Sequence, residues 1–475
     1  MGLGDNPTMS SEESRTSQAL VEPRWRQLWR AVPRAALGNL LAKLCMVGLG
    51  LAITVLVARQ GPAVQGAFAL FVAVESGLLT LFSGFGLWLA RQLSLRQGGQ
   101  YGAVRPMLTG VLRAAVGLGL VASLVLVGVS WWSTRLPYSL LWLLALAAPF
   151  LLLVPTATGL WLGQGRMWPI NLAQVAAPAS VLMGLSVVWW LTQGQTRQTP
   201  VVLLVLTAWV SGKSLVAVLT ALFGLHDAAR HDAALPQPAA REVEAPDTEP
   251  LSAPATPVWW SAWPFVLTIG VTNVISLLNY RVSLFLVERF HGLAAAGTYS
   301  VAVTVAELLW LLSSSVTVSA YARIGHPDLR VASAMTVQAV RINVLATLLA
   351  APILLGGAWW ALPWVMGAAY EASLWPLAAL LPGVAAYAAA SSLSAFYTNH
   401  LGKPHLSGAI AGLSLLTSLL VGLALVPRWG PTGAALASSS GYFLAISGAY
   451  AVFLRHAGLP LRALWTPSLT RDQRQ

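Results

Sequence analysis

The chain has 475 residues, of which 56% are hydrophobic and only 9% are charged. A soluble domain usually carries about 25% charged residues and cannot hide this much apolar sequence in its core. The composition therefore predicts a polytopic membrane protein. Cys45 is the single cysteine, which excludes an intramolecular disulfide. The net charge of +12 fits basic cytoplasmic loops better than nucleic-acid binding, so no nucleic-acid partner is expected.

The predicted fold is all-α, with twelve transmembrane helices in two lobes of six. A span needs about 20 apolar residues. On that scale the spans are residues 37–58, 67–90, 107–131, 139–163, 168–191, 200–224, 262–286, 297–320, 333–357, 374–399, 405–427 and 432–455.

The regions outside the spans are predicted to be cytoplasmic tails and a linker. Residues 1–36 form a tail that ends in a basic amphipathic lead-in suited to an anionic leaflet. Residues 37–224 form the N-terminal lobe and residues 258–455 the C-terminal lobe. Residues 225–257, rich in Ala, Pro and acidic side chains, are predicted to be a disordered cytoplasmic linker. Residues 456–475 form the second tail.

The distribution of positive charge supports this topology. With both termini cytoplasmic, the inner segments carry eighteen of the 28 Lys and Arg residues and the outer loops carry five. Such an excess on the inner side is typical of membrane proteins. The remaining five basic residues lie inside predicted spans, where a charge is costly and indicates a functional site.

The two halves of the chain look like a duplication. Arg59, Gly66 and Glu75 are repeated as Arg289, Gly297 and Glu307 at nearly the same spacing. Because each half has an even number of spans, the repeat is parallel, and a solute pathway is expected between the lobes.

No catalytic chemistry is predicted. The outer loops are short, and the sequence has no phosphate-binding loop, no zinc motif and no paired cysteines. His226 and His231, beside two aspartates in the linker, are interpreted as solvated sequence rather than metal ligands. A membrane-embedded polymerase or ligase would need a large polar loop. We therefore expect a transporter, not an enzyme, without cofactor or metal.

The basic residues inside the spans are the candidate substrate-binding set for an anionic head group: Arg281, Lys213, Lys43, Arg113 and Arg341. The last three lie near the cytoplasmic side, where snorkelling to the interface is an equal alternative. Lys213 and Arg281 are predicted to line a cationic cavity.

Two acids and three amides complete the candidate site. Glu75 and Glu307 are predicted near mid-bilayer, either as structural counter-charges of Lys213 and Arg281 or as carboxylates that titrate with a coupling proton. Amides within the spans either join helices or face a wet pathway. The candidates for a polar pathway are Asn39, Asn273 and Asn279.

Several short motifs resemble Wzx-type polysaccharide flippases of the MATE-like MOP exporter superfamily. They are Leu278-Asn279-Tyr280-Arg281, Gly297-Thr298-Tyr299-Ser300, Glu307-Leu308-Leu309-Trp310, Leu381-Pro382-Gly383, Gly402-Lys403-Pro404 and the run from Val426 to Ser438. Relatives often carry an Asp near the position of Arg281, where this chain has Val282 and Ser283. A counter-charge close to Arg281 in sequence is therefore missing.

The resemblance implies a flippase for undecaprenyl-diphosphate-linked oligosaccharide, working as a monomer by alternating access in the bacterial cytoplasmic (inner) membrane. Its product would serve O-antigen, capsule or exopolysaccharide synthesis, with a polysaccharide polymerase, glycosyltransferases and membrane lipids as partners. A coupling ion, H⁺ or Na⁺, is one driving force. The other is the membrane potential, which favours outward movement of negative charge by about 2.3 kcal/mol per charge per 100 mV.

Other functions stay open. A MATE-type multidrug or cation antiporter would favour acidic cavity residues, and a lipid II flippase usually has fourteen spans. A major-facilitator porter would carry a Gly-Asp-Arg-Arg signature in the loop that here reads RQLSLRQGGQYGAVRP. A membrane-embedded polysaccharide polymerase or ligase is the fourth alternative.

Overall fold

The computed structural model describes residues 34–95, 103–192, 198–234, 263–403 and 405–464. Within these ranges every regular element is a helix. Ten helical stretches of the described chain are long and apolar enough to cross a membrane. The all-α polytopic fold predicted from the sequence is therefore confirmed.

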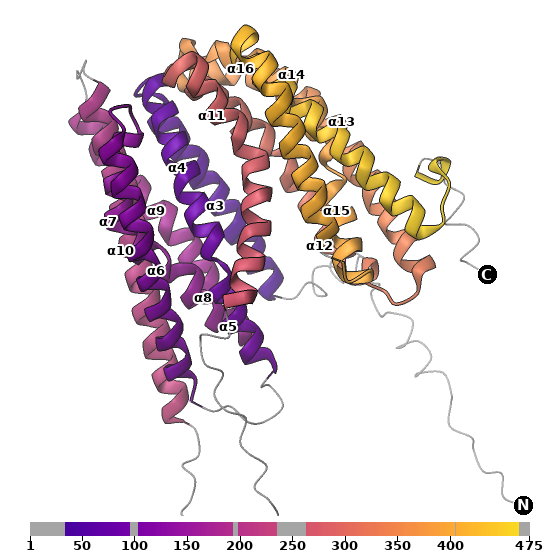
Figure 1. The fold of residues 1–475 in the computed structure, drawn as a ribbon, viewed down its shortest axis with the longest axis horizontal. Helices are drawn as coiled ribbons and strands as arrows, with labels where there is room; N and C mark the ends of the chain where they lie inside the picture. The colour runs from indigo at the N-terminus through magenta and orange to yellow at the C-terminus, as the bar shows by residue number, and fades with distance from the viewer. Residues whose placement is uncertain (1–33, 96–102, 193–197, 235–262, 404, 465–475) are drawn as a thin grey trace, which may run out of the picture.

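The N-terminal half of the chain forms one lobe, drawn in indigo to magenta in Figure 1. Its helices are α3 (Arg34–Ala58), α4 (Pro62–Phe82), α5 (Gly84–Leu95), α6 (Val104–Trp132), α7 (Leu141–Leu151), α8 (Leu153–Gly163), α9 (Met167–Leu191) and α10 (Gln198–Ala233). Two clusters of buried apolar side chains hold it together, one around Phe71 and one around Trp161.

The C-terminal half forms a second lobe, drawn in salmon to yellow (Figure 1). Its helices are α11 (Trp263–Glu307), α12 (Leu309–Ile324), α13 (Leu329–Met366), α14 (Leu374–Tyr387), α15 (Ala390–Ala395) and α16 (His405–Ala457), with short 3-10 and π turns at Ala368–Ser373 and Phe396–His400. Its apolar core also takes in Ala58, Leu70 and Ala73 of the N-terminal lobe.

Two of the ten stretches are long enough for two spans each. The stretch Trp263–Tyr321 has 59 residues and α16 has 53. A straight 53-residue helix would measure about 80 Å, against about 30 Å of bilayer hydrocarbon. Both are broken by a glycine in the left-handed region, Gly292 (φ 78) and Gly430 (φ 54), where a side chain would be strained. Division at these glycines would give twelve spans, and that number stays a prediction.

The repeated motifs meet at one end of the molecule, which we call the closed end. A Cβ added to Gly66 of α4 would lie 1.9 Å from the carbonyl oxygen of Leu293, and one added to Gly297 of α11 would lie 1.9 Å from that of Pro62. Only glycine permits this backbone contact. The sequence repeat is therefore a contact between the two lobes.

Hydrogen bonds across the lobes also gather at the closed end. They run from Arg59 Nε to Val365 O (2.7 Å), Tyr370 Oη to Ala58 O (3.0 Å), Gln65 Nε2 to Ser300 Oγ (3.2 Å) and Tyr138 Oη to Glu288 Oε2 (3.0 Å). Away from this end the lobes diverge, as Figure 1 shows. We call the opposite end the open end.

The first turns of α11 are the exception, because they pack on the N-terminal lobe at the open end. The rings of Phe85 and Trp263 meet edge to face at 5.7 Å. A Cβ on Gly84 would lie 2.8 Å from the Cα of Val266. Helix α11 thus crosses from one lobe at the open end to the lobe interface at the closed end.

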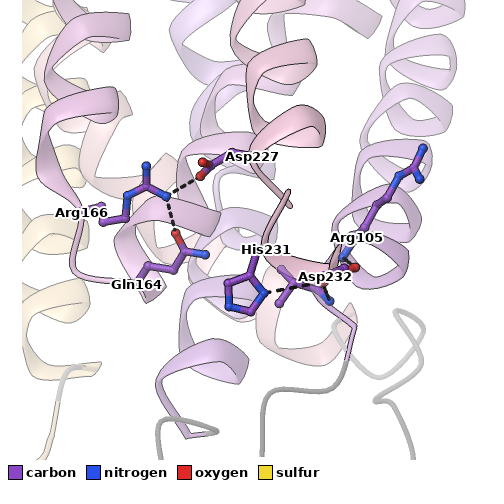
Figure 2. A network of polar contacts seen from close by, with 7 residues as sticks. Arg105, Gln164, Arg166, Asp227, His231 and Asp232 are labelled. Carbon is purple, nitrogen blue, oxygen red and sulfur yellow. Dashed lines mark hydrogen bonds and ion pairs between the residues drawn. The ribbon is translucent and has the colours of Figure 1, made fainter. Parts of the chain in front are cut away.

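The predicted start of the linker at residue 225 is wrong, because α10 continues to Ala233. Figure 2 shows part of the reason: Asp227 accepts a hydrogen bond from Arg166 Nη1 (2.5 Å). Asp227 also accepts from Trp161 Nε1 at 3.0 Å. Asp232 accepts from the backbone N–H groups of Val104 (2.8 Å) and Arg105 (2.9 Å).

Asp232 therefore satisfies two free N–H groups in the first turn of α6. These contacts hold the end of α10 in helical form against the rest of the lobe. The remainder of the predicted linker, most of the N-terminal tail and residues 465–475 lie outside the described residues.

Candidate functional site

A cavity of about 380 Å³ lies between the two lobes, and we call it the central cavity. Helices α3, α4, α9 and α10 line it from the N-terminal lobe and α11 from the C-terminal lobe. Its polar lining residues are Thr54, Gln65, Gln174, Lys213, Tyr280, Arg281, Ser300 and Thr304. Both lobes thus contribute one basic residue to the same space.

Lys213 enters the central cavity from α10 and is held by a buried acid. Its Nζ lies 2.5 Å from Oε1 of Glu75 on α4. The Glu75 side chain is 1% exposed, and that of Lys213 is 23% exposed. Trp209, one turn before Lys213, donates from Nε1 to Oε2 of Glu75 at 2.5 Å and places its ring 4.5 Å from the ammonium. Both carboxylate oxygens are therefore paired, as a buried charge requires.

Arg281 enters the same cavity from α11 and forms a looser pair. Its Nη1 lies 3.3 Å from Oε1 of Glu307, and the two side chains are 32% and 27% exposed. Tyr280, the preceding residue, also lines the central cavity, and its ring lies 4.9 Å from that of Trp310. This pair is longer and more exposed than that of Lys213 and Glu75, so Glu307 holds Arg281 less tightly than Glu75 holds Lys213.

The chain matches no protein-family model and no curated protein. It is similar in structure to a multidrug resistance MATE family transporter of the MOP superfamily in an inward-facing conformation, with a TM-score of 0.67, 15% identity, and 89% of this chain and 96% of that one covered. It is also similar to the lipid II flippase MurJ in an inward closed conformation, with a TM-score of 0.66, 13% identity and coverages of 90% and 88%. The chain has the MATE-like fold of the MOP transporters.

Two further structures with the MATE-like fold bear on conformation and on charge. An outward-facing multidrug resistance MATE family transporter gives a TM-score of 0.57, with 16% identity and coverages of 91% and 95%. A MOP superfamily transporter from Pyrococcus furiosus gives 0.55, with 14% identity and coverages of 90% and 95%. The binding pocket of that Pyrococcus furiosus transporter is described as having reverse polarity, which suggests a different function for it.

Three of the five predicted cations lie away from the cavity of this MATE-like fold. Arg113 is exposed on α6. Arg341 of α13 donates from Nε to the carbonyl oxygen of Leu464 at 2.5 Å and from Nη2 to that of Ala463 at 2.6 Å, so it ties down the chain after α16. Lys43 is exposed on α3 and does not line the cavity. The structure therefore does not support the prediction that Arg113, Arg341 and Lys43 line the cavity. The prediction used only the position of each residue along its span, which does not determine the helix face that carries the side chain.

Lys43 and Asn39 nevertheless share a helix face with cavity residues. They precede Met46 and Gly50 at spacings of three and four residues, which place side chains on one stripe of a helix. This spacing places Asn39 and Lys43 on the same stripe of α3 as those cavity residues, but nearer the start of the helix and outside the lining of the central cavity.

The other two asparagines lie in different surroundings. Asn273 lines a neighbouring cavity of about 510 Å³ that shares Gln174 and Lys213 with the central one. Asn279 is 1% exposed, and its amide has no hydrogen-bond partner among the described residues. Asn273 thus faces a cavity beside Lys213, while Asn279 is buried.

Trp209 and the pair Gln65–Ser300 are site residues that were not predicted from the sequence. The signal for Trp209 was its spacing of four residues before Lys213, which puts both side chains on one face of α10. No local signal connects Gln65 to Ser300, since they are 235 residues apart in sequence.

Proposed function

We propose that this chain is a flippase that carries a polyprenyl-diphosphate-linked oligosaccharide from the inner to the outer leaflet of the bacterial cytoplasmic membrane. The observation that carries the proposal is the joint lining of one interlobe cavity by Lys213 and Arg281, one from each lobe. A diphosphate is the anionic group that two such cations fit. The sugar is too polar for hydrocarbon, whereas the prenyl chain can stay in lipid.

The predicted topology and the conformation support the proposed direction of movement. The sequence prediction of cytoplasmic termini puts the open end on the inner side, where the substrate is made. The structure is more similar to the inward-facing MATE family transporter than to the outward-facing one. Opening the contact between Gly66 and Gly297 would expose the central cavity to the other leaflet by alternating access.

The two ion pairs have different roles in this proposal. The diphosphate displaces Glu307 from Arg281, because that pair is partly exposed and long at 3.3 Å. Glu75 keeps Lys213 neutralised until the carboxylate takes up a coupling proton, which frees the ammonium for the substrate. Movement of the anion outward is also favoured by an inside-negative potential.

Reconstitution in proteoliposomes tests the proposal. The probe is undecaprenyl-diphosphate-linked N-acetylglucosamine placed in one leaflet, and its arrival in the other is measured with a lectin. Arg281→Gln and Lys213→Gln should each slow flipping at least about tenfold, as expected for loss of a charge-assisted hydrogen bond of about 1.5–3 kcal/mol. Arg113→Gln is the matched control and should flip normally. Unchanged rates in both cavity variants would disprove the proposal.

A MATE-type cation antiporter is the second candidate, and a specific observation favours it. The aromatic side chains of Phe68, Trp209 and Tyr280 line the central cavity, and Trp209 donates to the buried carboxylate of Glu75, a setting that suits an organic cation. Ethidium efflux from proteoliposomes that depends on Glu75, without lipid flipping, would establish this function. Lipid II as the probe in the same flipping test separates a lipid II flippase from one for other polysaccharides.

A further inference from the structure

A second cavity lies inside the C-terminal lobe, and we call it the serine cavity. It measures about 320 Å³, within the range of about 300–1,000 Å³ typical of small-molecule sites. Six serines line it, with Tyr280, Tyr387, Tyr397 and Trp310. None of its described lining residues is charged. We infer that the serine cavity binds an uncharged sugar unit of the lipid-linked substrate.

The chemistry of the lining matches a sugar. A serine or tyrosine hydroxyl both donates and accepts hydrogen bonds, as a sugar hydroxyl does. Aromatic rings offer large apolar faces together with a polar edge. Tyr387 stacks on Tyr442 with ring centroids 4.9 Å apart, and Tyr280 packs on Trp310 at the same distance. The wall is therefore rigid and amphipathic.

Irregular helix turns at this cavity provide a second argument. Between α14 and α15 the helical hydrogen-bond pattern changes at Ala388 and Ala389, although both residues keep right-handed helical dihedrals, and a π turn follows α15. A similar change separates α11 from α12 at Leu308, just before Trp310. Single π turns within helices are frequent at functional sites.

Two polar groups at the serine cavity have no protein partner. Ser313 is 2% exposed, and its hydroxyl has no hydrogen-bond partner among the described residues. The indole N–H of Trp310 is likewise buried without a partner in the described structure. An unmet buried polar group costs free energy, and a ligand that pairs with it recovers that cost.

Tyr280 connects the serine cavity to the proposed diphosphate site, because it lines both cavities. Arg281 follows it directly on α11, so a diphosphate on Arg281 would bring the first sugar close to Tyr280. This inference rests on the proposed function, since it assigns the sugar end of the same substrate.

Lipid binding to the full-length protein in nanodiscs tests the inference. The probes are undecaprenyl diphosphate and the same lipid linked to N-acetylglucosamine, glucose or galactose, and native mass spectrometry gives the dissociation constants. Wild-type protein should bind at least one sugar-linked lipid more tightly than the bare diphosphate. The double variant Ser313→Ala/Trp310→Phe should bind that sugar-linked lipid about tenfold more weakly and the bare diphosphate unchanged.

The two changes differ in their expected effect on folding. Ser313→Ala removes a hydroxyl that has no partner in the described protein and should leave thermal unfolding unchanged. Trp310→Phe also shortens a ring that packs on Tyr280, Tyr387 and Tyr442, so the double variant should unfold at a somewhat lower temperature, and unchanged binding of the bare diphosphate will show that the fold is retained. Ser447→Ala on the exposed face of α16, where the hydroxyl bonds only to Phe443 O, is the control and should bind both lipids normally.

The outcomes separate the two proposals. Equal weakening for both lipids, no weakening for either, or no sugar-linked lipid preferred by wild type would each overturn the sugar subsite. Arg281→Gln should weaken both lipids. If it weakens neither while the double variant acts on the sugar-linked lipid alone, the diphosphate site is wrong and the sugar subsite stands.

Discussion

Gly66 and Gly297 touch backbone to backbone across the two lobes, each from one copy of a repeated motif. A Cβ on either glycine would lie 1.9 Å from a carbonyl oxygen of the opposite lobe. The contact is reciprocal, as expected for two copies related by a pseudo-twofold axis. The close packing of the two lobes at the closed end therefore requires that neither position 66 nor position 297 carries a side chain.

Substitution of Gly297 by Ala should therefore weaken the closed end. Relief of the clash needs a shift of α4 against α11, and such overpacking costs about 1–3 kcal/mol. We expect a lower temperature of thermal unfolding and slower flipping. Gly357 is the control, because a Cβ there would meet nothing within 4 Å. Gly357→Ala on helix α13 should be neutral or stabilising by up to about 1 kcal/mol. Equal behaviour of the two variants would contradict the role of the contact.

Much of the fold follows from local sequence. The apolar runs predict the helices, and the repeat of Arg59 and Gly66 as Arg289 and Gly297 predicts two related lobes. The linker boundary does not follow, because it depends on a long-range contact. Asp232 caps the start of α6 across more than a hundred residues of sequence, and no spacing rule connects an acidic, Ala-rich segment to that helix.

The site was predictable in composition but not in arrangement. Lys213 and Arg281 stand out in the sequence because each is a charged residue in an apolar run. Desolvation of such a charge is costly whichever face of the helix carries it. The same argument selected Arg113 and Arg341, which lie elsewhere, since the facing of a helix is decided by packing. The acid that Lys213 uses, Glu75, is 138 residues away in sequence. Glu75 and Glu307 were predicted to be either counter-charges or proton-coupling carboxylates. The structure contains both ion pairs, and proton coupling stays a prediction.

Lys213 and Glu75 should show strong coupling in a double-mutant cycle. Lys213→Met leaves Glu75, which is 1% exposed, without its main counter-charge. Loss of one partner of a buried pair costs about 3–5 kcal/mol, and replacement of both with neutral groups costs far less. Lys213→Met should thus lower the temperature of unfolding strongly, and Lys213→Met/Glu75→Gln should recover most of the loss. Additive effects would show that the pair is not coupled.

Tyr370 should couple the lobes, whereas Tyr397 should not. Tyr370 donates across the lobes to Ala58 O, and Tyr397 donates within the C-terminal lobe to Ala449 O. Each Tyr→Phe change removes one buried hydrogen bond and should cost about 1 kcal/mol. Hydrogen exchange distinguishes them: amides at the start of α4, from Ala63 onward, should exchange faster in Tyr370→Phe only. Faster exchange there in Tyr397→Phe would contradict this assignment.

The role of Asp232 sets the limit for shortening the linker. Deletion of residues 236–254 leaves α10 and its carboxylates in place, so flipping and stability should be retained if this segment is only a tether. Deletion of residues 232–254 also removes the carboxylate that accepts from Val104 and Arg105. Loss of a helix cap costs about 0.5–2 kcal/mol, so the longer deletion should unfold at a lower temperature. Asp232→Ala in the full-length chain should lower the unfolding temperature as much as the longer deletion does. Asp232→Asn should lower it less, because the amide oxygen still accepts one of the two hydrogen bonds. If the two deletions are equally stable, Asp232 is not the cap of α6.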